Sequence, residues 1–336
     1  MTIHRARAAE LLETFSSRRI LVVGDLMLDR YIIGSVSRIS PEAPVPVVHV
    51  NQEKAVLGGS SNVALNVRSL NGRAAVAGVM GEDADGELLC SLLNERGIGT
   101  DAVLRDHRIR TTVKTRVIAE RQQVVRIDWE DSFEFTPERL EKIQRGIEAE
   151  IADADGVVLE DYGKGVMTQE VVDIVLRAAL SKGIPVGLDP KDNHQLNLEG
   201  ITLATPNRKE AFIGAGVPEK PPAADPLSDG PLLKVGEILL KKWRPDHLAI
   251  TLGAQGMLLL DQGQPPKLVP TRAREVFDVS GAGDTVIATS VLARSAGASF
   301  YEAAELANYA AGVVVGKLGT ATCSPEELLN WLPESA

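Results

Sequence analysis

Residues 19–25 read Arg-Ile-Leu-Val-Val-Gly-Asp, an uninterrupted apolar run that ends in a glycine and a carboxylate. A short apolar run without polar alternation is typical of a strand that is buried on both faces. Five later segments repeat this pattern: 74–79, 156–159, 185–189, 201–204 and 247–252. The repetition predicts a set of buried strands whose carboxyl ends carry polar or glycine residues.

Segments with helical periodicity lie between these runs, at 60–70, 85–96, 137–152, 169–182 and 232–243. Strands that alternate with helices predict βαβ units, and therefore an α/β fold with a mainly parallel central sheet flanked by helices. Ligands of such sheets gather at the carboxyl ends of the strands. The residues that follow the apolar runs are Asp25, Asp161, Asp189, Asn207 and Gly253.

Two stretches interrupt the alternation. Residues 31–50 combine three prolines with several valines, and residues 111–129 predict two strands, at 113–119 and 124–129. We expect a small β-lid built from about 29–55 and 108–131, inserted in a single domain that covers 1–336. The alternative is that these strands extend an edge of the main sheet.

The composition narrows the function classes. The chain has 336 residues with 36 Lys plus Arg and 46 Asp plus Glu, a net charge of −10. Such an acidic chain is a poor generic binder of nucleic acid or anionic membranes, and an anionic substrate would need a local cluster of cations. Cys90 and Cys323 have no metal-type spacing and predict free thiols in a reducing compartment. Without a signal-peptide pattern or an apolar run of about 20 residues, the expected localisation is cytoplasmic.

The most specific motif is Asp-Val-Ser-Gly-Ala-Gly-Asp at 278–284, followed by an apolar helical run at 285–293. The amides of Gly281, Ala282 and Gly283 at a helix N-terminus would suit a phosphate or a developing anion. Asp284 in the first helical turn could act as a general base. A glycine-rich turn with an aspartate cap is the structural alternative, but the complete seven-residue string favours a catalytic turn. The chain contains no P-loop motif and no dinucleotide-binding glycine motif after a strand.

The 278–284 string resembles the C-terminal signature of the ribokinase-like (PfkB) carbohydrate kinases. Three further strings resemble motifs of that family and occur in the family's order: Gly-Gly-Ser-Ser-Asn at 58–62, Asn-Arg-Lys-Glu at 207–210 and Thr-Leu-Gly-Ala-Gln-Gly at 251–256. Segments 24–31, 37–48, 161–165, 189–191 and 312–320 resemble the heptose 7-phosphate kinases of ADP-heptose synthesis. In that group the kinase is fused to a nucleotidyltransferase or stands alone, and we expect the stand-alone form.

The resemblance implies a ribokinase-like fold with a β-lid, a homodimer formed through that lid, and ATP with Mg²⁺. It implies transfer of the γ-phosphoryl group to the anomeric C1 hydroxyl of D-glycero-D-manno-heptose 7-phosphate, a step of lipopolysaccharide core synthesis. Two alternatives stay open. One is a kinase for another sugar, such as ribose, a fructose phosphate or a ketogluconate, and the other is a non-catalytic sugar or nucleotide sensor.

The resemblance also implies roles for individual residues. Asp284 would be the base, and the amides of Gly281, Ala282 and Gly283 would hold charge on the moving group. The implied sugar contacts are Asp25, Asp29, Gly58, Gly59 and Asn62. The implied nucleotide contacts are Asn207, Glu210, Thr251, Gly253, Gly256, Val276, Asn308 and Gly319. Asn207 and Glu210 would lie near Mg²⁺ through water, and Asp278 with Ser280 would hold a monovalent cation such as K⁺.

A sugar phosphate requires cations, and the candidates are Lys114, Arg116, Arg126, Lys164 and Lys191. A lone Lys or Arg is usually a solvated surface charge, and we favour that interpretation for Arg116 and Arg126. Lys164 lies in a Gly-Lys-Gly string after a predicted strand, and Lys191 follows Asp189-Pro. We expect at least one of these two lysines to bind the substrate phosphate.

Overall fold

The computed structural model describes residues 3–120, 122–131, 133–191 and 196–334. Its main sheet has nine strands in the order β13-β12-β11-β10-β9-β8-β1-β4-β5. The strands from β5 to β11 pair in parallel, and β12 and β13 are antiparallel to their neighbours. Their bounds are β1 Arg19–Gly24, β4 Arg73–Gly81, β5 Ile98–Asp106, β8 Gly156–Glu160, β9 Val186–Asp189, β10 Leu203–Ala204, β11 His247–Thr251, β12 Met257–Asp261 and β13 Lys267–Val269. The predicted mainly parallel α/β fold is confirmed.

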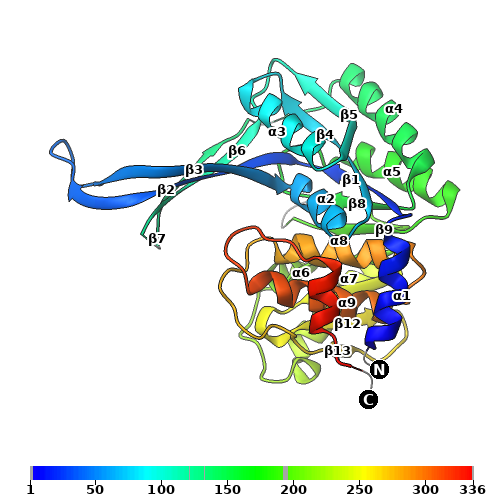
Figure 1. The fold of residues 1–336 in the computed structure, drawn as a ribbon. Helices are drawn as coiled ribbons and strands as arrows, with labels where there is room; N and C mark the ends of the chain where they lie inside the picture. Colours follow the sequence, from blue (N-terminus) through cyan, green and yellow to red (C-terminus); the bar gives the residue numbers. More distant parts are fainter. Residues whose placement is uncertain (1–2, 121, 132, 192–195, 335–336) are drawn as a thin grey trace.

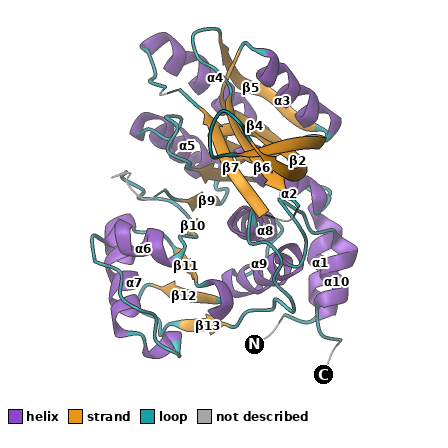
Figure 2. Cartoon of the chain, turned by 90° about the vertical axis from the view of Figure 1, so that its left-hand side faces the viewer, coloured by secondary structure: helices purple, strands orange, loops and turns teal. Residues whose placement is uncertain are grey.

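Helices cover both faces of this sheet (Figures 1 and 2). The core cluster on one face includes α1 Arg5–Phe15, α2 Ser60–Ser69, α3 Ala84–Glu95, α8 Ala282–Ser295, α9 Phe300–Val315 and α10 Pro325–Trp331. The cluster on the other face includes α4 Pro137–Asp153, α5 Gln169–Lys182, α6 Arg208–Ala215 and α7 Gly230–Trp243. None of the helices in these described ranges is long and apolar enough to span a membrane.

Strand β1 explains why its sequence does not alternate. Ile20 and Val22 belong to the core on one face, whereas Leu21 and Val23 belong to the core on the other. Successive side chains of a strand point to opposite faces, so a strand with helices on both sides needs apolar residues at every position.

A second sheet has four strands in the order β3-β2-β6-β7, and we call it the small sheet. Its strands are β2 Leu26–Ile39, β3 Pro46–Gly59, β6 Thr112–Ala119 and β7 Gln122–Trp129. All neighbours are antiparallel except β2 and β6. The β2–β3 hairpin projects far from the helices in Figure 1. The two strands predicted within 111–129 are confirmed, and the alternative that they extend the main sheet is wrong.

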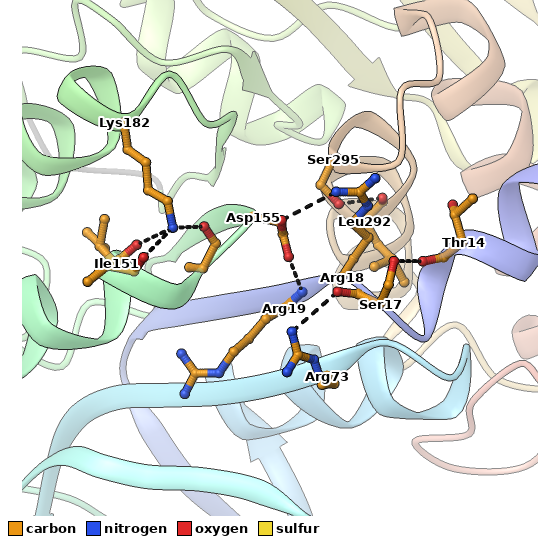
Figure 3. Close-up of polar contacts among 12 residues, drawn as sticks. Thr14, Ser17, Arg18, Arg19, Arg73, Ile151, Asp155, Lys182, Leu292 and Ser295 are labelled. Atoms are coloured by element: carbon orange, nitrogen blue, oxygen red, sulfur yellow. Dashed lines mark hydrogen bonds and ion pairs between the residues drawn. The ribbon is translucent and has the colours of Figure 1, made fainter.

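A polar network fixes the amino ends of the central strands (Figure 3). The Asp155 carboxylate accepts hydrogen bonds from the Arg19 amide at 2.8 Å and from Arg18 Nη1 at 3.4 Å. Lys182 Nζ donates to the carbonyl oxygens of Ile151 and Ala154 at the C-terminal end of α4. This network lies at the amino ends of the strands, and therefore on the side of the sheet away from their carboxyl ends.

Candidate active site

A cavity of about 170 Å³ lies where the carboxyl ends of β8, β9 and β11 meet the N-terminus of α8. Its lining residues are Glu160, Asp161, Tyr162, Asp189, Pro190, Lys191, Thr205, Asn207, Glu210, Thr251, Gly283 and Asp284. The predicted positions Asp161, Asp189 and Asn207 therefore do meet in space. Asp25 and Gly253 are not among the described lining residues.

Asp284 stands in the first turn of α8 and is only 8% exposed. Its Oδ2 accepts a hydrogen bond from Asn62 Nδ2 at 2.6 Å, and its Oδ1 accepts one from the Tyr162 hydroxyl at 2.8 Å. Burial raises the pKa of Asp284, and the two hydrogen bonds partly oppose this rise. A nearly buried carboxylate with a raised pKa that still faces a cavity is suited to accept a proton.

The turn before α8 has the geometry of an anion site. Gly281 caps the helix with a φ of 78°, in the left-handed region that favours glycine. The Ala282 amide donates to the carbonyl of Val279 at 3.2 Å, so one of the three predicted amides already serves the turn itself. Gly283 lines the cavity. The N-terminus of α8 is therefore directed at the space beside Asp284.

Asp278 fastens this turn to the segment that follows α9. Its Oδ1 accepts from the Ser280 amide at 2.9 Å and its Oδ2 from the Gly319 amide at 3.1 Å. Both carboxylate oxygens of the residue predicted to hold a monovalent cation thus have amide partners. The K⁺ site at Asp278 and Ser280 stays a prediction.

Three carboxylates crowd one wall of the cavity. Oxygen atoms of Glu160, Asp189 and Asp284 lie within 4.8 Å of one another. Glu160 is 1% exposed, and its Oε2 has no hydrogen-bond partner within the described part of the chain. Burial, together with the neighbouring carboxylates, raises the pKa of both Glu160 and Asp189 well above the ordinary range.

An unpartnered buried carboxylate oxygen beside two more carboxylates calls for a proton or a cation. Oxygen donors are the ligands that Mg²⁺ prefers, so these residues fit a divalent metal ion. Sequence reasoning missed Glu160, although it directly follows a predicted buried strand at 156–159.

Asn207 and Glu210 also line this cavity and form a capping box at the start of α6. The Asn207 side chain accepts from the Glu210 amide at 3.0 Å, and Glu210 Oε2 accepts from the Asn207 amide at 2.9 Å. Thr251 lies beside Asn207 through a parallel bridge. The motif therefore starts a helix and also lines the cavity, which leaves a water-mediated metal contact as a prediction.

The predicted sugar contacts have partners within the protein. Asp25 is 2% exposed, and its carboxylate accepts hydrogen bonds from the amides of Tyr162, Lys164 and Val166 at 2.9–3.1 Å. Asp29 forms an ion pair with Arg116 at 2.7 Å. A sugar contact of Asp25 or Asp29 stays a prediction.

Gly58 and Gly59 end β3 where two chain segments meet closely. A Cβ atom on Gly58 would lie 2.9 Å from Asp29 Cγ, and one on Gly59 would lie 2.7 Å from the carbonyl oxygen of Asp25. Gly59 also has a φ of 53°. Glycine is thus required here by packing, and Asn62, in the first turn of α2, donates to Asp284.

One face of the small sheet carries the predicted cations. The register places Asp29 opposite Lys114, Lys114 opposite Asp128, and Arg116 opposite Arg126, so these side chains share a face. The ion pair of Arg116 with Asp29 leaves the Arg116 side chain only 21% exposed. The interpretation of Arg116 as a solvated surface charge is therefore wrong. It holds for Arg126, which is 52% exposed and paired with Asp128.

This face lies within electrostatic range of the turn at 278–284. Burial raises the pKa of Asp284, and the negative charge of Asp29 adds to the rise. Burial by itself would raise the pKa of Asp278. Hydrogen bonds from Ser280 and Gly319 and the positive charge of Arg116 outweigh this effect, so the pKa of Asp278 is lowered. Charges on this face of the small sheet therefore act on both aspartates of the 278–284 turn.

The two predicted lysines lie on different sides of the 161–166 turn. Lys164 Nζ pairs with Glu130 at 2.7 Å and borders a narrow hollow that also contains Asp25. Lys191 is exposed and lines the cavity beside Asp284. Lys191 is therefore the better placed of the two for a ligand beside Asp284.

The other predicted nucleotide contacts lie in the turn after β11, in the segment before α8, within α9 and just after it. Gly253 has a φ of 56° with open space where a Cβ atom would be. Gly256 has a φ of 92°, and a Cβ atom there would lie 2.1 Å from the Val269 carbonyl oxygen. Asn308 Nδ2 donates to the Pro270 carbonyl at 2.7 Å. Val276 is 62% exposed. The adenine contacts of these residues stay predictions.

Comparison with known proteins decides the family. The profile of the pfkB family carbohydrate kinases matches residues 17–327. This chain belongs to the pfkB family of carbohydrate kinases. As a carbohydrate kinase, it is a phosphotransferase that acts on a sugar hydroxyl.

The relatives of this pfkB-family kinase include longer proteins. It is 44% identical over 314 residues to the bifunctional protein HldE of Desulfatibacillum aliphaticivorans, covering 94% of this chain and 63% of the relative. It is 44% identical over 321 residues to the bifunctional protein HldE of Caulobacter vibrioides, covering 95% of this chain and 64% of the relative. The chain thus spans less than two thirds of the length of these relatives.

Solved structures share the kinase fold. Arabidopsis thaliana ribokinase complexed with ribose and ATP has a TM-score of 0.70 and 22% identity, covering 95% of this chain and 99% of that one. Phosphofructokinase-2 from Escherichia coli in complex with potassium has a TM-score of 0.73 and 20% identity, covering 93% of this chain and 97% of that one. At these identities, the likeness establishes the ribokinase-like fold alone.

Proposed function

We propose that this kinase transfers the γ-phosphoryl group of ATP to the anomeric C1 hydroxyl of D-glycero-D-manno-heptose 7-phosphate. The product would be heptose 1,7-bisphosphate, an intermediate of ADP-heptose and lipopolysaccharide core synthesis. The observation that carries the proposal is the placement of Asp284, which is 8% exposed, faces a cavity of about 170 Å³, and begins the helix that follows the anion turn. Identity of 44% with HldE proteins and the heptose-kinase-like segments in the sequence support the choice of sugar.

Asp284 would accept the proton of the C1 hydroxyl as its oxygen attacks the γ-phosphorus in line with the leaving ADP. The amides of Gly281 and Gly283 and the N-terminus of α8 would stabilise the charge on the transferred group. Phosphoryl transfer depends mainly on alignment and on charge neutralisation, and this arrangement can supply both.

Mg²⁺ would be held on the carboxylate side of the cavity by Glu160 and Asp189, with Asn207 and Glu210 reaching it through water. When bound, it neutralises charge on the ATP phosphates. The orphaned Oε2 of Glu160 is the feature of this chain that supports the assignment.

The sugar would bind between Asp284 and the polar face of the small sheet, with Lys191 or Lys164 at its 7-phosphate. We propose one kinase domain, residues 1–336, to which the small sheet acts as a lid. The outer strand β7 exposes Val124, Val125, Ile127 and Trp129, each at least 40% accessible. An apolar edge strand of this kind supports a homodimer formed through the small sheets. Free thiols and the pathway both suit the cytoplasm.

A coupled ADP-release screen over sugars and sugar phosphates, with ³¹P NMR of the product, tests the proposal. We expect turnover with heptose 7-phosphate and a new anomeric phosphate resonance. Turnover with ribose or a fructose phosphate, and none with the heptose, would establish a different sugar kinase. ATP binding without ADP release for any sugar would favour the sensor.

A further inference from the structure

We propose that Asp25 and Tyr162 are positioning residues for the base. Asp25 fixes the turn at residues 161–166, and that turn holds the Tyr162 hydroxyl against Asp284. The inference rests on the proposed role of Asp284 as the general base, and it assigns Asp25 a function other than sugar binding.

The first link is the anchor of the turn. Asp25 Oδ2 accepts from the amides of Tyr162 at 2.9 Å and Lys164 at 3.0 Å, and its Oδ1 accepts from the Val166 amide at 3.1 Å. An ionised carboxylate accepts about four hydrogen bonds, so one side chain organises three backbone groups of this turn. Because Asp25 is 2% exposed, water cannot readily replace these bonds.

The turn itself has a shape that requires such an anchor. Gly163 has a φ of 68° and Gly165 a φ of 110°, both in the left-handed region. A Cβ atom on Gly165 would lie 2.4 Å from the carbonyl oxygen of Phe133. Since these conformations are unfavourable for other residues, the backbone path is specific, and the direction of the Tyr162 side chain follows from it.

The second link is the contact with the base. The Tyr162 hydroxyl donates to Asp284 Oδ1 at 2.8 Å, while Asn62 Nδ2 holds Oδ2 at 2.6 Å. Tyr162 arrives from the segment after β8 and Asn62 from α2, so the carboxylate is held from two sides. Each oxygen keeps a further lone pair for an acceptor hydroxyl. Fixing the carboxylate plane keeps that lone pair aligned, and small misplacements of a reacting group cost large factors in rate.

Asp25 is separate from the reacting space. Among the described residues, Tyr162 and Asp284 line the cavity of about 170 Å³, and Asp25 does not. With three of its acceptor sites occupied by amides, Asp25 acts on the site through the turn.

The first experiment compares Tyr162→Phe with Tyr301→Phe. Tyr301 is the matched control because its hydroxyl also donates to an aspartate at 2.8 Å, Oδ2 of Asp261, away from the site. For Tyr162→Phe we expect kcat to fall 10- to 100-fold, with KM for ATP and for the accepted sugar within about twofold of the wild type. Tyr301→Phe should leave kcat unchanged. An unchanged or increased kcat in Tyr162→Phe would overturn the inference, since the hydroxyl would then be dispensable or would block the acceptor.

The second experiment combines Asp25→Asn with Tyr162→Phe. If Asp25 acts through Tyr162, the double variant should lose no more kcat than the worse single variant. If Asp25 instead binds sugar, KM for the sugar should rise and the two effects should multiply, which would refute the chain of contacts. If Asp25→Asn fails to fold, Gly163→Ala perturbs the turn independently, since only Lys191 Cγ at 3.8 Å lies near its Cβ position.

Hydrogen exchange on the substrate-free protein provides a readout that does not depend on activity. The amides of Tyr162, Lys164 and Val166 should exchange slowly in the wild type and in Tyr162→Phe, and at least tenfold faster in Asp25→Asn. Equal exchange in all three proteins would overturn the anchoring role. Absence of turnover with any sugar phosphate would count against the proposed function. The exchange pattern would still test, independently of activity, whether Asp25 anchors the turn at 161–166.

Discussion

Substitution of Asp284 by Asn should separate catalysis from stability. The amide is isosteric with the carboxylate, so its oxygen can accept from Asn62 and its NH₂ can donate to the Tyr162 oxygen, and the local packing is kept. Loss of the general base should lower kcat by roughly 10²–10⁴, about 3–5 kcal/mol in the barrier. KM for ATP should change much less, because the anion turn is untouched.

The same substitution should stabilise the metal-free protein. Oxygens of Glu160, Asp189 and Asp284 lie within 4.8 Å of one another. Two unit charges at that distance repel by about 3 kcal/mol at an effective dielectric constant of 20. Since the raised pKa values of Glu160 and Asp189 mean that protonation already relieves part of this repulsion, we expect a gain of about 1–2 kcal/mol, or a few degrees in Tm.

The sign of the pH dependence follows from the raised pKa of Asp284. A carboxyl group whose pKa is higher in the folded state favours folding fully below its unfolded value of 3.8, and this contribution is lost as pH rises through the folded value. The Tm advantage of Asp284→Asn should therefore be largest near pH 7 and should vanish towards pH 4.

Steady-state ADP release in the presence of Mg²⁺ measures the loss of turnover. Thermal melting in EDTA between pH 4 and pH 8 measures the gain in stability. Asp173→Asn, an exposed aspartate on α5, serves as a surface control and should change neither quantity. A variant that retains turnover within about threefold of the wild type would refute the assignment of the base. A lower Tm than the wild type at pH 7 would refute the argument from charge repulsion.

Three further predictions concern other parts of the molecule. Alanine at both Lys164 and Lys191 should raise KM for the phosphorylated sugar at least tenfold and leave KM for ATP within about twofold, because Lys164 belongs to the turn that borders the cavity and Lys191 lines the cavity itself; an unchanged sugar KM would exclude both. Trp129→Ser should shift the protein from dimer to monomer in light scattering, since this 50% exposed side chain lies on the outer strand of the small sheet; a wild type that is already monomeric would contradict the dimer. Burial raises the pKa of Cys323 to about 12, and its side chain is only 1% exposed. At pH 8 a thiol reagent should therefore label Cys323 only after the protein is unfolded, and rapid labelling of the native protein would contradict this.

The fold could be predicted where strands buried on both faces appear in the sequence as continuous apolar runs. The run at 19–25 has apolar residues on both faces because helices cover both sides of β1, and the same reasoning located most of the other central strands. The antiparallel pair β12 and β13 could not be recognised, since a short apolar run reads alike in either direction. The predicted strand at 201–204 contributes only Leu203–Ala204 to the sheet, because pairing rather than composition sets a strand's length.

The site was predictable where a motif is local and unpredictable where two segments must meet. Asp284 and its glycine turn form one continuous string. Glu160 was missed because its neighbour Asp161 is equally acidic, and only the end of β8 decides which carboxylate enters the cluster. Tyr162 was missed because its partner is 122 residues away. Arg116 was misjudged because alternation assigns it to a face of the small sheet but does not say that Asp29, 87 residues earlier, pairs with it there.

The distribution of charge indicates which group must neutralise ATP. The protein carries a net charge of −10, and three of its carboxylates cluster in the wall of the cavity. Three cations near the site are compensated, since Arg116 pairs with Asp29, Lys114 with Asp128 and Lys164 with Glu130. Among the described residues that line the cavity, Lys191 is the one cation. A cation that is already paired adds little net attraction for a polyanion unless its partner moves away. The ionised carboxylate cluster alone would repel the nucleotide. A divalent cation bound to the cluster would offset this negative charge and attract the ATP phosphates instead. We therefore infer that a bound divalent cation, together with Lys191, would allow ATP to approach Asp284.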